Sequence, residues 1–326
     1  MRTPSRAWLV CLLLAPAYDA AGQSTGDPVG VRAAGMAGAF VSVVDDASAV
    51  YWNPGALASG AYFSLVLDRN TQRAIPDGGS PASGQSGLLI AIGTPPLGLS
   101  YYRTRQVSAV GVPGQTLTGA RVASLVAHHG GVTVVQSLSR SLAIGTTFKL
   151  VRGVVALEDG ASGTPSALLD AADRLSGRST TRLDADVGVM LTGSLVQAGL
   201  TVRNLFEPQF SAAGGAAPVR LERQARAGVA LKLSPQWRVA TDWDFMKAAT
   251  VDGRRRDAAV GTEGHPGRRV WVRGGFRWNT AGEAPKRPTT SIGGSYALLG
   301  SLIVDAQAGG GTDGYRGWGM GARFVF

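Results

Sequence analysis

Three histidines are the residues of this sequence best suited to acid–base or metal chemistry, and their spacing favours neither. His128 and His129 are adjacent, so on a strand their side chains point to opposite faces and make poor co-ligands for one metal ion. Ser124 lies four residues before His128, which on a strand separates the two by roughly 13 Å, too far for a nucleophile and its base. His265 precedes a Pro-Gly pair and is predicted in a turn. We therefore predict a protein that is not an enzyme, with no metal site and no cofactor.

Charged residues recur instead at every second position of apolar stretches. In residues 269–278, for example, Val, Phe and Trp alternate with Arg, so a strand here has one apolar and one basic face. A soluble sheet would turn the apolar face inward, whereas a membrane barrel turns it toward lipid and lines its lumen with the polar face. In a barrel, the lumen would be lined by Lys149, Arg203, Arg226, Lys232, Arg238, Asp242, Asp244, Arg273, Arg277 and Arg323.

The strands that carry these residues have the spacing of an outer-membrane barrel. Short connections, as at 95–96 and 299–300, alternate with longer ones at 70–86, 108–118 and 158–179, which is the turn-and-loop pattern of such barrels. The predicted fold is therefore all-β: a transmembrane antiparallel β-barrel of about 14 strands. The candidate strands are 61–69, 87–94, 97–107, 119–137, 141–157, 180–191, 197–205, 220–232, 236–247, 256–264, 268–279, 287–298, 301–310 and 316–326.

Both ends of the chain agree with export to a membrane. Residues 1–22 have a basic start, a short apolar run and a zone of small residues, which predicts a signal peptide cleaved near residues 20–22. The last strand places Phe324 and Phe326 on one face and ends on an aromatic ring. We interpret these two residues as a terminal signal for the machinery that inserts outer-membrane barrels. The apolar run at the start is too short to span a bilayer, which takes about 20 residues.

Composition narrows the class of protein further. The chain has 326 residues, of which 46 are Gly, and a formal net charge of +10. The basic residues are spread thinly, and the short run 254–256 lies among turn residues, so we interpret it as a solvated loop and expect no nucleic-acid partner. Several Tyr and Trp residues fit the aromatic girdles of a membrane barrel, among them Tyr62, Tyr101, Tyr102, Trp237, Trp278 and Trp318.

The segment before the first strand does not alternate. Its run Gly35-Met36-Ala37-Gly38 is small enough for close backbone packing. Asp45 or Asp46 is placed to cap a short helix over residues 47–51, and Asn53 followed by Pro54 predicts the start of another through residue 57. A compact segment rich in small residues suits the plug of a barrel lumen.

Residues 30–58, GVRAAGMAGAFVSVVDDASAVYWNPGALA, resemble the start of FadL-like outer-membrane barrels, in particular the PorV-like and TraF-annotated branch. The family pattern has Gly at position 37, where this chain has Ala, and Ala-Gly after the proline, where this chain has Gly55-Ala56. The matching residues include Gly35, Met36, Gly38, Asp45, Asp46, Tyr51, Trp52, Asn53 and Pro54. Shorter segments that are similar to the family, at 202–205, 242–244, 261–263 and 272–275, extend the resemblance over most of the chain.

The resemblance implies a division into a signal peptide (1–22), an N-terminal plug (23–60) and an outer-membrane barrel (61–326). It also implies two alternative functions. One is passive transport of small hydrophobic compounds, of the long-chain fatty-acid type, past a movable plug or hatch. The other is an accessory or structural barrel that assists protein secretion without transporting small molecules. The expected partners are outer-membrane lipid, the insertion machinery and either a hydrophobic small molecule or a secretion-system protein.

The acidic pair of the plug gives a physical hypothesis. A lumen lined by basic residues would attract Asp45 and Asp46 and hold the plug in place by buried ion pairs. The alternative is that both carboxylates only cap helices.

Overall fold

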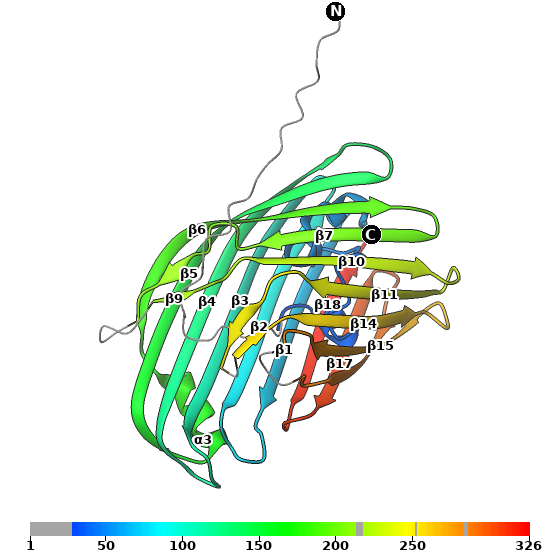
Figure 1. Cartoon of the computed structure of the whole chain (residues 1–326). Helices are drawn as coiled ribbons and strands as arrows, with labels where there is room; N and C mark the ends of the chain where they lie inside the picture. The colour runs from blue at the N-terminus through cyan, green and yellow to red at the C-terminus, as the bar shows by residue number, and fades with distance from the viewer. Residues whose placement is uncertain (1–27, 213–217, 252, 283–285) are drawn as a thin grey trace, which may run out of the picture.

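The computed structural model describes residues 28–212, 218–251, 253–282 and 286–326, and these form a closed antiparallel barrel of fourteen strands (Figure 1). The predicted signal peptide lies outside the described residues. Every barrel strand pairs with its neighbours along the chain, and β1 pairs with β18 to close the ring. The barrel strands are β1 (Ser64–Ala74), β2 (Ala82–Thr94), β3 (Leu97–Val112), β4 (Leu117–Ser137), β5 (Leu142–Gly163), β6 (Arg178–Thr192), β7 (Val196–Arg203), β10 (Gln224–Lys232), β11 (Trp237–Asp244), β14 (Asp257–Gly264), β15 (Val270–Asn279), β16 (Thr289–Ala297), β17 (Leu302–Gly311) and β18 (Arg316–Val325).

The predicted strand number and the predicted direction of the two faces are confirmed. Large apolar side chains such as Phe148, Leu231 and Trp243 are exposed on the outer face, while the charged residues between them are buried on the inner face. None of the helices in the described residues is long and apolar enough to cross a membrane.

The long connections differ from the prediction because several strands continue beyond their apolar part. β1 runs to Ala74 and β2 starts at Ala82, so most of 70–86 is strand, and 108–118 is reduced to a short turn in the same way. These extensions lack alternation, which is why the sequence did not show them. Further elements lie in the remaining loops: α3 (Pro165–Ala171), η2 (Ala172–Arg174), and two small sheets, β8 (Gln209–Phe210) with β9 (Val219–Arg220) and β12 (Ala248–Thr250) with β13 (Gly253–Arg255).

Two interpretations of single residues were wrong. Tyr102 does not join an outer girdle with Tyr101: successive side chains of a strand face opposite ways, so Tyr102 is buried inside, stacked on His129 at 4.1 Å between ring centroids. Residues 254–256 are not a solvated loop either. Arg255 pairs with Asp257 at 2.7 Å, and the guanidinium of Arg256 lies 5.7 Å from the Trp243 ring.

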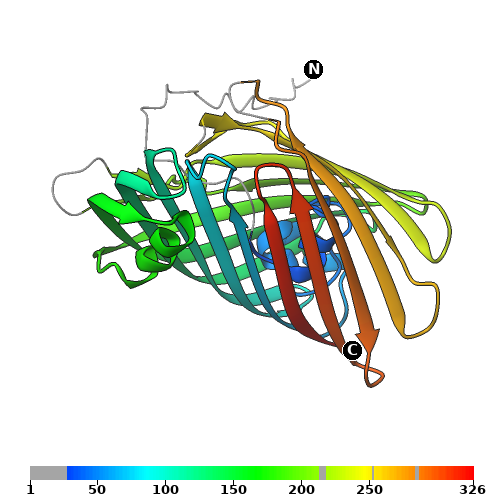
Figure 2. The same ribbon diagram turned by 90° about the horizontal axis from the view of Figure 1, so that it is seen from below.

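The N-terminal segment, residues 28–60, lies within the ring of strands (Figure 2). It forms α1 (Val31–Gly35), α2 (Ala49–Trp52) and the 3-10 helix η1 (Pro54–Ser59). α1 contacts β16 and β17, while η1 contacts β4, β5 and β6, so the segment reaches opposite sides of the wall. Its apolar residues, including Met36, Phe40 and Trp52, form the main buried cluster of the protein together with inner-face residues such as Leu89 and Met190.

Candidate functional site

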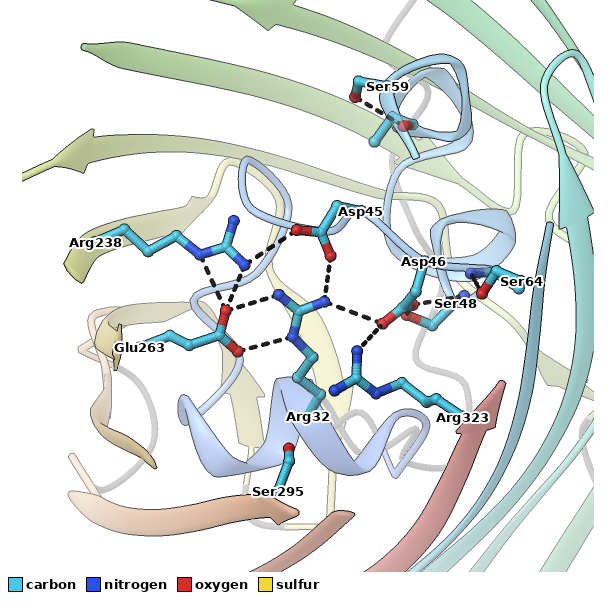
Figure 3. A network of polar contacts seen from close by, with 12 residues as sticks. Arg32, Asp45, Asp46, Ser48, Ser59, Ser64, Arg238, Glu263, Ser295 and Arg323 are labelled. Carbon is cyan, nitrogen blue, oxygen red and sulfur yellow. Dashed lines mark hydrogen bonds and ion pairs between the residues drawn. The ribbon is translucent and has the colours of Figure 1, made fainter. Parts of the chain in front are cut away.

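Arg32 of α1 is the centre of a buried ion-pair network between the N-terminal segment and the wall (Figure 3). Its guanidinium donates two parallel hydrogen bonds to Glu263 of β14, at 2.8 and 2.7 Å. The remaining nitrogen, Nη1, bonds Asp45 and, at 3.0 Å, Asp46. Arg32 therefore links both acidic residues of the segment to one carboxylate of the wall. Paired, bidentate contacts of this kind are stronger than neutral hydrogen bonds.

Three basic residues of the wall surround this centre. Arg238 of β11 bonds Glu263 and, at 3.2 Å, Asp45. Arg273 of β15 also bonds Glu263 and lies 3.4 Å from Asp305 of β17.

Arg323 of β18 completes the network. It bonds Asp305 at 2.7 Å and approaches Asp46 at 3.4 Å. The network balances four guanidinium groups with four carboxylates: Arg32, Arg238, Arg273 and Arg323 against Asp45, Asp46, Glu263 and Asp305. Because the charges are buried and matched, removing one partner leaves an uncompensated charge.

The two acidic residues of the segment differ in burial. The Asp46 side chain is 2% exposed, whereas that of Asp45 is 45% exposed. Burial on its own would raise the pKa of Asp45, but Arg32 and Arg238 outweigh it and hold the pKa below its usual range. Asp45 is therefore an ionised partner of these two basic residues.

Neither Asp45 nor Asp46 caps a helix, contrary to the alternative. The second helix is α2, which starts at Ala49, and its N-cap residue Ser48 makes no side-chain cap bond. Asp46 accepts the backbone N–H of Ser48 at 2.9 Å, one residue before the helix begins. The prediction for the next helix is confirmed: Asn53 accepts the backbone N–H of Gly55 and Pro54 occupies the first turn of η1.

Polar side chains of the wall also bind the backbone of the segment directly. Asp242 of β11 accepts the N–H groups of Phe40 and Val41, both at 2.9 Å. Asp68 of β1 accepts the N–H of Val31 at 2.9 Å. The amide nitrogen of Asn53 donates to carbonyls of both the segment and β6, each at 3.0 Å. These bonds satisfy backbone groups that regular secondary structure leaves unpaired.

Two glycines are required by this packing. Gly38 has φ near +90°, a backbone conformation that favours glycine. Gly145 of β5 lies under η1, where an added Cβ would overlap the backbone of Pro54 and come within 2.6 Å of the Gly55 nitrogen. The wall is therefore shaped to the segment at these positions. Gly35 and Met36 are buried, and Gly35 lies against Gly293 of β16.

The aromatic residues of the motif face the remaining basic residues. The guanidinium of Arg203 lies 4.4 Å from the Tyr51 ring, and that of Arg226 lies 5.7 Å from the Trp52 ring. Cations above aromatic faces attract the ring electrons. Arg226 also forms a bidentate pair with Asp244, at 2.6 and 3.1 Å.

Besides Arg203, Arg226, Asp242 and Asp244, three more predicted lumen residues lie apart from the network. Lys149 is buried and bonds Asp186 at 2.7 Å and Asp184 at 3.2 Å. Lys232 is half-buried and bonds the carbonyl of Gly193 at 3.3 Å. Arg277 lies 3.7 Å from Asp257. The structure thus places every predicted lumen charge on the inner face. Of these, only Arg238 and Arg323 contact the acidic pair of the segment, and Arg273 joins the network through Glu263 and Asp305.

A polar cavity of about 410 Å³ lies beside the network at the end of the barrel with short turns. Arg32, Asp45, Asp46, Glu263 and Arg323 line its inner part. Lys232, Trp237, His265 and Trp271 lie nearer the turns. Its charged groups other than Lys232 already pair with one another, so the cavity resembles a vestibule more than an apolar binding pocket.

The other end of the lumen has an apolar inner surface. On β4 and β5, the side chains of Leu125, Ala127, Val151 and Val155 form a buried cluster with Phe210 and the residues that flank it. Phe210 is fully buried, and its ring occupies the space over Gly153 on the inner side of β5. The small sheet β8–β9 therefore covers apolar wall that faces the lumen.

Several site residues were missed from the sequence. The acidic members Glu263, Asp305, Asp68, Asp184 and Asp186 lie on inner faces but were not recognised as lumen residues. Alternation in their strands was the available signal, since each shares a face with other polar residues. Arg32 was recognised only as part of the motif. Among the described residues, no group of three or more His, Cys, Asp or Glu side chains is placed to hold a metal ion.

Comparisons with known proteins bear on the fold. A protein-family profile described as F plasmid transfer operon, TraF, protein matches residues 105–244. No curated protein matches the sequence. Three solved structures cover nearly the whole chain. The CymD monoaromatic hydrocarbon channel is 15% identical with a TM-score of 0.67, over 93% of this chain and 98% of CymD.

The other two are similar in extent. A Pseudomonas aeruginosa FadL homologue is 12% identical with a TM-score of 0.64, over 94% of this chain and 100% of that chain. The Ralstonia pickettii toluene transporter TbuX is 13% identical with a TM-score of 0.63, over 93% of this chain and 99% of TbuX. The fold is FadL-like. At these identities the likeness concerns the fold, and the activity of this chain has to be inferred from its own residues.

Proposed function

We propose that this protein is an outer-membrane channel for passive uptake of small hydrophobic compounds. The observation that carries the proposal is the apolar inner surface of β4 and β5 at the loop end, covered by Phe210. An apolar surface inside a lumen offers a binding site to an apolar ligand. The names of the CymD and TbuX channels, which refer to monoaromatic hydrocarbon and toluene, support a ligand of this class.

The membrane location is part of the proposal. A closed barrel satisfies every backbone polar group without water, and its outer face carries exposed Leu, Ile, Val, Phe and Trp side chains around the ring. We infer that residues 1–22 direct export and that Phe324 and Phe326 act in insertion. Phe326 is 66% exposed and packs edge-on against Phe324, with ring centroids 4.6 Å apart.

In this proposal the N-terminal segment acts as a plug. It crosses the lumen between the apolar surface and the polar vestibule, so a ligand bound at the loop end cannot pass while the segment stays in place. Release of the segment from Arg238, Glu263 and Arg323 would open a route toward the short-turn end. The buried, matched charges supply the barrier to that release.

Ligand binding to protein refolded in detergent tests the proposal. Labelled toluene and a labelled long-chain fatty acid are titrated against wild type, Phe210→Ala and Phe206→Ala. Phe206 lies in the same loop but is 59% exposed, so it is the matched control. We expect Phe210→Ala to bind the apolar ligand more tightly because it uncovers the surface, while Phe206→Ala binds like wild type. The ligand that binds identifies the substrate size, and Asn53→Ala adds a variant with a loosened segment.

Absence of binding by both ligands, or equal binding by the two Phe variants, would contradict the proposal. The second candidate is an accessory barrel that assists protein secretion. The balanced network of four cations and four carboxylates favours it, because a segment held this firmly suits a barrel that stays closed. A protein that binds neither ligand but keeps its barrel closed in conductance recordings would support this second function.

A further inference from the structure

Basic residues also occupy the outer face of the barrel, in a row across β1 to β5 that is interrupted on β2 by Leu88. The register pairs Arg69 of β1 with Leu88 of β2, Leu88 with Arg103 of β3, Arg103 with His128 of β4, and His128 with Arg152 of β5. Residues directly opposite each other on paired strands point to the same side of a sheet. We call Arg69, Arg103, His128 and Arg152 the outer basic row.

The row lies at the edge of the apolar outer surface that is nearer the loops. On the same face, two positions along the strand toward the short turns from each arginine, lie Leu67, Tyr101 and Leu150, which are 44%, 39% and 58% exposed. On the opposite side of the row, toward the loops, β1 and β3 continue on the same face with Thr71 and Arg105. On β1, β2 and β3 the row therefore marks the level at which the outer face changes from apolar to polar, whereas β4 and β5 continue with Val126 and Val154.

α3 and η2 cover the outer face just beyond the row. Leu168, Leu169 and Ala172 are buried against Val107 and Ala109, which share their side of β3 with Arg103 and Arg105. The acidic residues of this insert are used locally: Asp170 pairs with Arg73 at 2.6 Å and Asp173 pairs with Arg105. α3 and η2 thus supply counter-ions to Arg73 and Arg105, on the loop side of the row, and to none of the residues in the row.

The three arginines of the row have no counter-ion among the residues that the structure describes. Within the described part of the chain, the guanidinium groups of Arg69, Arg103 and Arg152 make no hydrogen bond or ion pair, whereas those of the inner Arg residues of the network all do. His128 bonds the hydroxyl of Tyr101 at 2.8 Å on the same face. Arginine is well suited to phosphate because its planar donors match the phosphate oxygens.

We propose that the outer basic row binds the phosphate groups of a phosphorylated glycolipid in the outer leaflet, of the lipid A type. The apolar residues below the row contact its acyl chains, and the three arginines contact its phosphates. The inference rests on the proposed membrane location, because only a lipid-facing wall presents this row to headgroups. It is independent of what passes through the lumen.

Binding of purified lipid A to the full barrel in neutral detergent, followed by native mass spectrometry, tests the site. The variant Arg69→Gln/Arg103→Gln/Arg152→Gln removes three charges from the row. The matched control, Arg140→Gln/Arg268→Gln/Arg269→Gln, removes the same charge from exposed residues of the short turns at the other end. Each basic residue near an anionic headgroup contributes about fivefold in affinity, so the row variant should bind on the order of 100-fold more weakly. The control should bind like wild type.

Two further lipids separate the sources of phosphate. Dephosphorylated lipid A and phosphatidylglycerol should both bind weakly to wild type. Equal binding of either lipid, or wild-type affinity in the row variant, would overturn the proposal. Arg152 is exposed, so Arg152→Gln alone, with an expected loss of about fivefold, keeps the test available where the triple variant does not refold. Toluene and fatty-acid binding by the same samples shows whether the proposed channel function stands or falls separately.

Discussion

The two ends of the lumen differ in the kind of contact that their inner walls make: charged contacts at the short-turn end and apolar contacts on β4 and β5 at the loop end. Toward the short turns, the N-terminal segment meets the wall through Arg32, Glu263 and their ionised neighbours, beside a polar cavity. Toward the loops, the inner wall of β4 and β5 is apolar and is covered by Phe210. Charged contacts depend on exact partners, whereas apolar contacts are non-directional and depend on area. The short-turn half therefore fixes one position of the segment, and the loop half can accept different apolar groups.

The strongest test of this contrast is removal of the central carboxylate. Glu263 accepts hydrogen bonds from Arg32, Arg238 and Arg273, so Glu263→Gln leaves buried arginines undercompensated. Breaking a buried pair costs about 3–5 kcal/mol. We expect a large rise in the open fraction in single-channel recordings, and exposure of residues 28–60 to protease. Asp159→Asn, in an ion pair whose side chains are more than 60% exposed, is the control and should behave like wild type. A closed Glu263→Gln barrel would refute the anchoring role.

A substitution at the other side of the segment should have a smaller effect. Gly145→Ala places a Cβ against the backbone of η1, and such overpacking costs about 1–3 kcal/mol. We expect partial displacement of η1, seen as faster cleavage of the segment by protease, with the barrel intact by circular dichroism. Gly130→Ala on the adjacent strand β4 meets no atom within 4 Å and serves as the control. Equal protection of both variants would mean that η1 adapts without moving.

The same contrast explains what the sequence could predict. Alternation of apolar and charged residues, as in 269–278, predicts a barrel strand with an apolar outer face and a polar inner face. The fourteen strands and the direction of their two faces could therefore be predicted from the sequence. The loop ends of β1, β2, β3 and β5 did not follow, whereas β4 and β6 match their predicted bounds to within two residues. There the outer face carries small or polar residues, as at Ser86 and Gly84, and part of it is covered by α3, so no period remains to be read.

For the site, the sequence identified residues but not their partners. Asp45 and Asp46 were correctly expected to meet basic wall residues, and they do so at Arg238 and Arg323. Their nearest partner, Arg32, comes from the segment itself, only 13 residues before Asp45. Which charges meet depends on the rotation of the segment inside the ring. That rotation is set by contacts distant in sequence, such as Asp242 with the backbone of Phe40, which no local pattern records.

The two acidic residues of the segment should differ in effect. Asp46 is buried and hydrogen-bonded, so Asp46→Asn should weaken anchoring by about 2 kcal/mol. Asp45 is 45% exposed, and solvent screening should reduce the cost of Asp45→Asn to less than about 1 kcal/mol. The open fraction of each variant in single-channel recordings measures the difference, with the double variant as a check on additivity. If Asp45→Asn opened the barrel more than Asp46→Asn, burial would not be what ranks these contacts.

The smallest effect on the open fraction is expected from a fall in pH. This effect shows whether Asp45 anchors the segment by its negative charge or only by the packing of its side chain. Arg32 and Arg238 hold the pKa of Asp45 below its usual range, so the ionised form is favoured in the closed barrel. The contribution of Asp45 to anchoring is therefore fully present above the ordinary carboxyl pKa of about 4, and it is lost as the pH falls further. We expect an unchanged open fraction between pH 8 and 5 in wild type and a rise below about pH 4. Asp45→Asn should show a smaller rise, because one titrating partner is gone. An equal acid response in wild type and Asp45→Asn would assign the response to other carboxylates and leave Asp45 with a role in shape alone.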